Sequence, residues 1–110
     1  MHMPTAIQHF FDEESLDTAM SAFAEYAVVK DEGNTYTGRT AIRAWRVASR
    51  ERYDFVSQPF EMFSRGGIVT IRANVSGNFP GSPVVLDYDF RLLKDRIVEL
   101  EIGYAELSGS

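Results

Sequence analysis

Residues 68–78 have the sequence IVTIRANVSGN, in which apolar and polar side chains alternate from Val69 onward. The apolar set is Val69, Ile71, Ala73 and Val75. A repeat of two residues places one set on each face of an extended strand, so the pattern predicts a β-strand with one buried and one solvated face. Such a strand needs neighbours to pair with and a second layer to cover its apolar side.

Three further segments supply the neighbours. Residues 84–92 and 98–102 alternate in the same way, and residues 54–64 form a longer strand in which Pro59 predicts a bulge or bend. Only short turns separate the last three strands, which predicts an antiparallel meander. The positions expected to face the covering layer are Val69, Ile71, Ala73, Val75, Val84, Leu86, Tyr88, Phe90, Val98, Leu100 and Ile102.

The covering layer is predicted to come from three helices in the first half of the chain. One helix begins near Pro4, which suits a first turn. A second follows Ser15, whose side chain can cap it, and its apolar residues run at helical spacing as far as Phe23. A third is predicted to have Thr40 as its N-cap and to turn Trp45 inward.

Between the second and third helices the pattern predicts a small hairpin. Residues 27–31 form a short strand, residues 32–34 a turn, and residues 36–37 pair back. On the third helix, arginines recur at helical spacing, which is typical of a solvated face. This cluster consists of Arg39, Arg43, Arg46, Arg50 and Arg52.

Helices followed by a sheet that they cover define an α+β fold: a curved antiparallel sheet packed on three N-terminal helices. The 110 residues suit a single domain spanning 1–110.

The net charge of −5 removes the usual attraction to phosphate backbones, so we expect no nucleic-acid partner. Two His and no Cys argue against a metal site, and no cofactor is expected. With no predicted leader or membrane span, we expect a cytoplasmic protein that does not contact a membrane.

Several segments together resemble a known superfamily. Residues 21–31 (SAFAEYAVVKD) resemble the passage from the second helix into the first strand of ketosteroid isomerases. Residues 36–45 (YTGRTAIRAW) resemble the entry to the third helix in the wider group. Residues 75–83 and 90–92, with 97–102, resemble the closing strands of its uncharacterised bacterial members. The order and spacing of these motifs are similar to those of the nuclear transport factor 2-like superfamily, which includes ketosteroid isomerases and polyketide cyclases.

This resemblance implies a cone, in which the strongly curved sheet wraps around the helices and leaves an open pocket. Members of the superfamily include isomerases, polyketide cyclases, epoxide hydrolases and dehydratases, and others are binding or assembly modules. The fold alone therefore does not determine the function. The resemblance also implies a homodimer, which we expect to form through the outer, charged face of the sheet.

Asp31 is the first candidate for chemistry. It matches the position of the proton-shuttling carboxylate of the isomerases, and strand alternation places it with Ala27 and Val29 on the apolar side. Burial raises the pKa of a carboxyl group, which suits a base that works near neutral pH. The alternative is that Asp31 only opens the turn at residues 32–34, with its carboxylate bonded to backbone N–H groups.

Tyr88 is the second candidate. It lies two residues before Phe90, where the resemblance implies a protonated aspartic acid in the oxyanion hole, and a phenol can donate the same hydrogen bond. The alternative is a tyrosine whose ring lies in the core with its hydroxyl at the rim. The isomerases also carry a tyrosine on the first helix, and counting back from Asp31 without gaps places Ile7 there. One of the two oxyanion donors is therefore missing.

The sequence thus favours a pocket for a small apolar ligand, with possible isomerase-like or cyclase-like chemistry on a compact carbonyl compound. The residues expected to line it are Phe11, Phe23, Val29, Trp45, Met62, Val75 and Phe90. At helical and strand periodicity, residues of this kind more often belong to plain core packing. The charged residues on the outer face are expected to form solvated cross-strand pairs: Arg72, Asp87, Asp89 and Arg91. The alternative function is a non-catalytic ligand-binding or dimerisation module.

Overall fold

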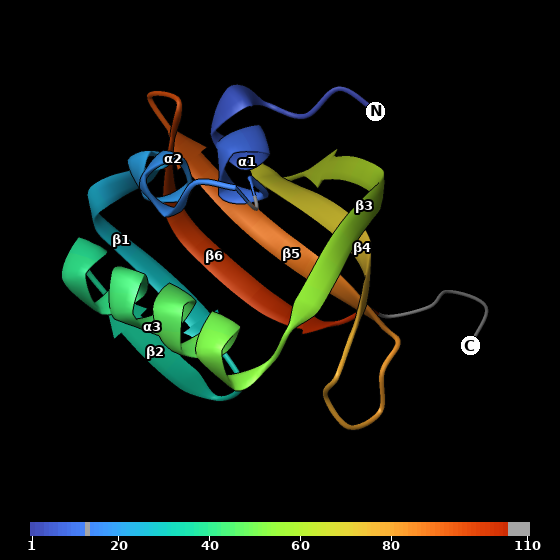
Figure 1. The fold of residues 1–110 in the computed structure, drawn as a ribbon. Coiled ribbons are helices and arrows are strands. Elements are labelled where there is room, and N and C mark those ends of the chain that lie inside the picture. The colour runs from blue at the N-terminus through green and yellow to red at the C-terminus, as the bar shows by residue number, and fades with distance from the viewer. Residues whose placement is uncertain (13, 106–110) are drawn as a thin grey trace.

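The computed structural model describes residues 1–12 and 14–105. Within these residues the chain forms three helices and one six-stranded sheet (Figure 1). The helices are α1 (Thr5–Phe10), α2 (Leu16–Ser21) and α3 (Arg39–Arg52). The strands are β1 (Phe23–Asp31), β2 (Asn34–Thr37), β3 (Phe55–Arg65), β4 (Ile68–Gly77), β5 (Val84–Leu93) and β6 (Arg96–Tyr104).

The strands lie side by side in the order β2-β1-β6-β5-β4-β3. The predicted meander is confirmed, because β3, β4 and β5 each pair antiparallel with the next strand along the chain. The predicted hairpin of β1 and β2 is confirmed as well. The two halves meet where β1 pairs parallel with β6. This junction places the N-terminal hairpin beside the final strand.

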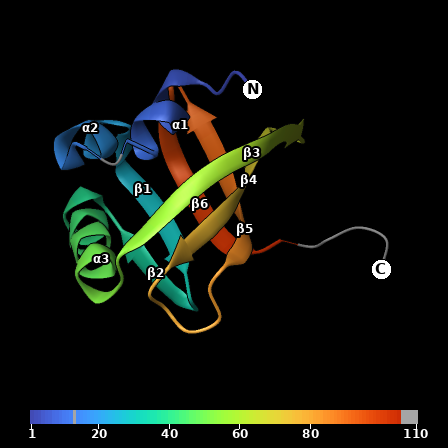
Figure 2. The ribbon, with the colours of Figure 1, turned by 45° about the vertical axis from the view of Figure 1, so that its right-hand side comes forward.

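All three helices lie on one side of the curved, open sheet (Figures 1 and 2). The α+β cone is therefore the observed fold. The core forms between the two layers, and its largest fully buried side chains are Phe23, Phe90, Ile7, Ile42, Ile71, Ile97, Leu100 and Val29. No helix among the described residues is both long enough and apolar enough to cross a membrane.

Two helix boundaries differ from the prediction. Ser15 does cap α2, accepting a hydrogen bond from the Thr18 backbone N–H at 3.1 Å, but the helix ends at Ser21. Phe23 is instead the first residue of β1, where it pairs with Ile97. Phe23 fitted the apolar spacing of α2 because the first buried residue of a strand can follow the last apolar residue of a helix at helical spacing by chance. The N-cap of α3 is Gly38, with a φ of 87° that favours glycine, rather than Thr40.

The bulge predicted at Pro59 is confirmed. The register of β3 against β4 shifts between Pro59 and Glu61, so that one extra residue bends β3. Near the start of the same strand, β3 and β4 approach closely at Gly77, where a Cβ would collide with the carbonyl oxygen of Asp54. Figure 2 shows the resulting pair, β3 and β4, turned across the face of β5 and β6.

A second bulge, in β6, was not predicted. Arg91 pairs with Glu99 but Leu92 pairs with Ile97, so the intervening Val98 is the extra residue. Ile97 therefore takes the buried place expected for Val98. Beyond the bulge, Leu100 faces inward as expected. A period of two read straight through 98–102 cannot detect such an inserted residue.

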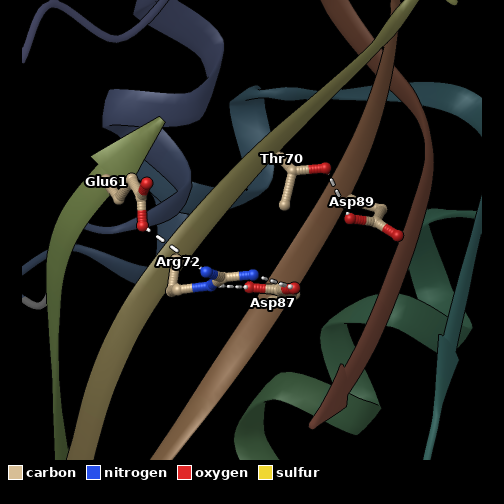
Figure 3. A network of polar contacts seen from close by, with 5 residues as sticks. All are labelled: Glu61, Thr70, Arg72, Asp87 and Asp89. Atoms are coloured by element: carbon tan, nitrogen blue, oxygen red, sulfur yellow. Dashed lines mark hydrogen bonds and ion pairs between the residues drawn. The ribbon is translucent and has the colours of Figure 1, made fainter. Parts of the chain in front are cut away.

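The outer face of the sheet carries the predicted charge pairs. Arg72 donates to Asp87 through Nε at 2.9 Å and Nη2 at 3.2 Å, and it lies 3.5 Å from Glu61 (Figure 3). Thr70 donates to Asp89 at 2.7 Å. Arg72 and Asp87 retain only 15% and 19% of their side-chain exposure, so this pair is less solvated than expected.

Candidate functional site

Asp31 is the last residue of β1, and its side chain lies on the side of the sheet that faces the helices. The indole Nε1–H of Trp45, a buried residue of α3, donates to Asp31 Oδ2 at 3.0 Å. Trp45 is itself held against Tyr36 of β2, with ring centroids 6.0 Å apart. Burial raises the pKa of Asp31 above its ordinary value, the Trp45 hydrogen bond opposes that rise, and the nearby Glu32 carboxylate adds to it.

Tyr88 lies in the middle of β5 and is only 5% exposed. Its hydroxyl is 3.2 Å from Ser57 Oγ of β3. Its ring is surrounded by other rings, with centroids 5.0 Å from Phe11, 6.0 Å from Phe10 and 6.5 Å from Phe90. Burial raises the pKa of Tyr88, and the Ser57 hydrogen bond opposes the rise. The phenol is therefore firmly protonated at neutral pH.

The strand register places the two candidates in one row across the inner face. Tyr88 pairs with Ile102 of β6, and Lys30 pairs with Glu101, so continuing the parallel register by one residue sets Asp31 beside Ile102. Asp31 and Tyr88 thus lie about 10 Å apart as backbone positions, two strand spacings. The carboxylate of Asp31 also contributes to the raised pKa of Tyr88. The half-buried Ile102 lies between them in this row.

Two arginines predicted to be solvated instead belong to this interior. Arg46 is 8% exposed, donates to the carbonyl oxygen of Phe10 at 2.9 Å, and stacks 4.9 Å from the Phe10 ring centroid. Arg50 donates to the carbonyl oxygen of Phe55 at 2.9 Å and lies over that ring at 4.1 Å. The reason is that Phe10 ends α1 and its carbonyl lacks a partner within the helix. Both guanidinium groups lower the pKa of Tyr88.

The predicted lining residues lie in or against the same core. Phe23, Val29, Trp45, Val75 and Phe90 are buried, and Phe11 and Met62 are partly buried and packed against them. Of these, Trp45 contacts Asp31 directly and Phe11 contacts Tyr88. Ile7 is fully buried, so the first helix presents an aliphatic side chain where the resemblance implied a tyrosine.

Two hollows lie away from Asp31 and Tyr88. One, of about 250 Å³, opens on the outer face and is lined by Val28, Lys30, Ile68, Asp89, Arg91, Glu99, Leu100 and Glu101. The other, of about 580 Å³, lies beside the start of α3 and is lined by Glu25, Tyr26, Thr37, Gly38, Arg39, Thr40 and Arg96. Neither hollow is lined by Asp31 or Tyr88, which lie in the ring-lined interior.

Sequence reasoning missed Ser57, Ile102 between the two candidates, and Arg46. Ser57 alternates with the exposed Val56 and Gln58, which is a weak sign that it faces inward. Its approach to Tyr88 depends on the curvature of the sheet, which no local pattern reports. The sequence pattern predicted a solvated Arg46, because arginines at helical spacing usually mark a solvated surface.

Comparison with known proteins places this geometry in a family. No protein-family model matches the chain, and no curated protein does. A candidate polyketide cyclase from Sinorhizobium meliloti, protein SMa1630, shares 39% sequence identity over 92% of this chain and 95% of that chain, with a TM-score of 0.88. A hypothetical protein of ketosteroid isomerase-like fold from Catenulispora acidiphila, in complex with trimethylamine, shares 20% over 94% and 88%, with a TM-score of 0.80.

A third structure, TerC co-crystallised with polyporic acid, shares 11% identity over 91% of this chain and 88% of that chain, with a TM-score of 0.78. At such identities the last two matches show the fold alone. The fold and the interior therefore define an α+β cone protein whose aromatic inner wall carries polar groups. The chain belongs to the nuclear transport factor 2-like superfamily, in which ketosteroid isomerase-like and polyketide cyclase-like proteins are its structural neighbours.

Proposed function

We propose that the protein binds a compact, mostly apolar carbonyl compound between the helices and the sheet and transfers a proton on it. The observation that carries this proposal is the row Asp31, Ile102, Tyr88, with a carboxylate and a phenol at its two ends. The similarity to a candidate polyketide cyclase at 39% identity supports carbonyl chemistry. The trimethylamine and polyporic acid complexes of two neighbours support a small ligand.

Asp31 acts as the base in this proposal. One carboxylate oxygen takes a proton from the carbon next to the carbonyl group, and the electron pair of that C–H bond becomes part of an enolate. Tyr88 donates a hydrogen bond to the carbonyl oxygen as it gains negative charge. In an isomerase, Asp31 returns the proton to another carbon. In a cyclase, the enolate carbon bonds to a second carbonyl carbon and the resulting alkoxide takes the proton.

The environments of the two groups suit these roles. Burial moves the pKa of Asp31 upward, which strengthens it as a base, while the Trp45 hydrogen bond keeps the ionised form accessible. Burial keeps Tyr88 protonated, and only a protonated phenol can donate to an enolate oxygen. Burial raises both pKa values, so Asp31 becomes a stronger base while Tyr88 keeps its proton.

The direct test is exchange of hydrogen for deuterium at the carbon next to the carbonyl group. A panel of small apolar ketones in D2O is followed by proton NMR with the wild-type protein. We expect exchange above the buffer rate, a loss of at least ~100-fold in Asp31→Asn, and a loss of about 100-fold in Tyr88→Phe. Asp95→Asn, in an exposed turn, is the matched control and keeps the wild-type rate. Equal exchange by wild type and Asp31→Asn on every ketone would overturn the proposal.

A non-catalytic ligand-binding or dimerisation module is the second candidate, and the packing of the interior favours it. Phe10 and Phe11 place their rings 6.0 Å and 5.0 Å from that of Tyr88, which leaves little free space around the phenol. In this case an apolar ketone protects the protein against thermal unfolding without any exchange of its protons. The same panel of ketones therefore distinguishes the two candidates.

We also propose that two copies associate through the outer face of the sheet. The partly buried Arg72–Asp87 pair lies there, and none of the three helices in the described part of the chain covers it. Val56 and Phe63, on the same face by register, remain 52% and 41% exposed. Large apolar side chains around charged pairs are typical of interfaces with a polar, hydrated character.

A further inference from the structure

The Tyr88 hydroxyl needs a fixed direction if it is to meet a carbonyl oxygen. We propose that Ser57 is a positioning residue for Tyr88, which fixes the phenol by the 3.2 Å contact between the hydroxyls and donates to the phenol oxygen when charge develops there. This inference rests on the proposed function, because Tyr88 matters for chemistry only as the donor to the enolate. It names a residue that neither sequence pattern nor resemblance selected.

The Ser57–Tyr88 contact depends on the curvature of the sheet, because the two residues are not neighbours in the strand register. Ser57 pairs with Val75 and Tyr88 pairs with Ile71, so two strand spacings and four residues of β4 separate them. In a flat sheet their Cα atoms would be roughly 16 Å apart, given about 4.8 Å between strands and about 3.3 Å per residue. The two side chains cannot span that distance. The turned β3–β4 pair in Figure 2, with its bulge after Pro59, brings them together.

The inner face of β4 leaves room for this contact. The residue between Ile71 and Val75 on that face is Ala73, which is fully buried. Its single methyl group leaves space above β4, through which the side chains of β3 and β5 meet. A branched side chain at this position would fill the path between Ser57 and Tyr88.

Ser57 suits the task chemically. A buried hydroxyl without a partner is costly, and the Ser57 hydroxyl both donates and accepts. When Ser57 donates to the phenol oxygen, the proton of Tyr88 is free to point at a ligand. The same donation stabilises negative charge on the phenol, which opposes the rise in pKa caused by burial. The missing donor on the first helix, where Ile7 stands, makes this support for the single phenol more important.

The charged groups around Tyr88 also affect its pKa, and their effect must stay constant in a test of Ser57. Arg46 and Arg50 of α3 lower the pKa of the phenol, and Asp31 of β1 raises it. None of these is changed by a substitution at Ser57. Ser57→Ala should therefore report the hydroxyl contact alone, and Ser57→Thr should restore it.

The readout is the ionisation of Tyr88 in protein labelled with 3-fluorotyrosine, because the fluorine lowers each phenol pKa into a more accessible range and gives a separate ¹⁹F signal. Tyr88→Phe identifies the Tyr88 signal among the five tyrosines. We expect the titration midpoint of Tyr88 to move upward in Ser57→Ala and to stay near wild type in Ser57→Thr. Ser64→Ala, which removes an exposed hydroxyl from the same strand, should leave it in place.

Ketone exchange provides the second readout. Ser57→Ala should lose about fivefold in rate, as expected for one hydrogen bond, and Ser57→Thr should recover it. An unmoved Tyr88 midpoint in folded Ser57→Ala, or equal shifts in Ser57→Ala and Ser64→Ala, would overturn the inference. Because the fluorine titration needs no substrate, a shifted midpoint supports the Ser57–Tyr88 contact even if the wild-type protein exchanges no ketone.

Discussion

At the scale of residues, two of the interior contacts join polar side chains in pairs. Trp45 of α3 donates to Asp31 of β1, and Ser57 of β3 contacts Tyr88 of β5. Each pair joins two elements that are distant in sequence. An unpaired buried polar group costs about 1–3 kcal/mol, so these partners stabilise the fold as well as directing the groups. Each pair also moves a pKa in the direction opposite to burial.

The Trp45 contact gives a specific spectroscopic prediction. The chain has one tryptophan, so its indole N–H gives one NMR signal. This N–H donates to Asp31, so its chemical shift should follow the ionisation of that carboxyl group. We expect a titration midpoint above the ordinary value of 3.8, and no titration in Asp31→Asn. An indole signal that does not change with pH, or that titrates at or below the ordinary value, would contradict the contact or the burial of Asp31.

Asp31 and Tyr88 could be selected from the sequence because alternation placed both on the apolar side and motif order agreed. Their partners could not be selected in the same way. Trp45 was expected only as an apolar lining residue, since helical spacing says nothing about where an indole N–H points. Ser57 required knowledge of how far the sheet curves.

At the scale of elements, the predicted order of helices and strands is observed, and two of the errors occur where two elements meet. Phe23 fits the apolar spacing of α2 but begins β1, because the backbone turns at Ala22, whose carbonyl oxygen accepts from Ile97 of β6. Arg46 fits a solvated stripe on α3 but caps the end of α1. In both cases a tertiary contact overrides a local pattern.

At the scale of the whole molecule, the two faces of the sheet carry different kinds of side chains. The inner face carries the polar pairs under the helices, and the outer face carries the Arg72–Asp87 pair and its neighbours (Figure 3). The bulge in β3 links the faces: Ser57, before the bulge, lies on the inner face, whereas Glu61 and Phe63, after it, lie on the outer face beside Arg72.

The outer face leads to a prediction about assembly. We expect light scattering at high concentration to give twice the mass of one chain. Phe63→Glu should shift the protein toward monomer, because it places a charge in the proposed interface. Phe60→Glu, at the bulge, is a control of similar exposure. A wild-type protein that remains at the mass of one chain at high concentration would exclude the homodimer.

We propose that Asp31 is a desolvated carboxylate that acts as a base, rather than only a turn residue. Its raised pKa means that the native state holds the proton longer than the unfolded chain does. Proton binding by Asp31 therefore stabilises the native state fully below the ordinary value of 3.8, and this stabilisation is lost as the pH rises through the folded pKa. Asn carries no charge at any pH, and its side-chain oxygen can still accept from Trp45.

The most direct measurement is the free energy of unfolding of wild type and Asp31→Asn, from denaturant melts at pH 5 and pH 8. We predict that Asp31→Asn is as stable as wild type or more stable at pH 8, with a smaller advantage at pH 5, while ketone exchange is abolished. A carboxylate governed by its backbone hydrogen bond at Glu32 rather than by burial would behave in the opposite way, because that bond lowers the pKa. A variant less stable than wild type at pH 8, by up to about 1 kcal/mol, would contradict the account.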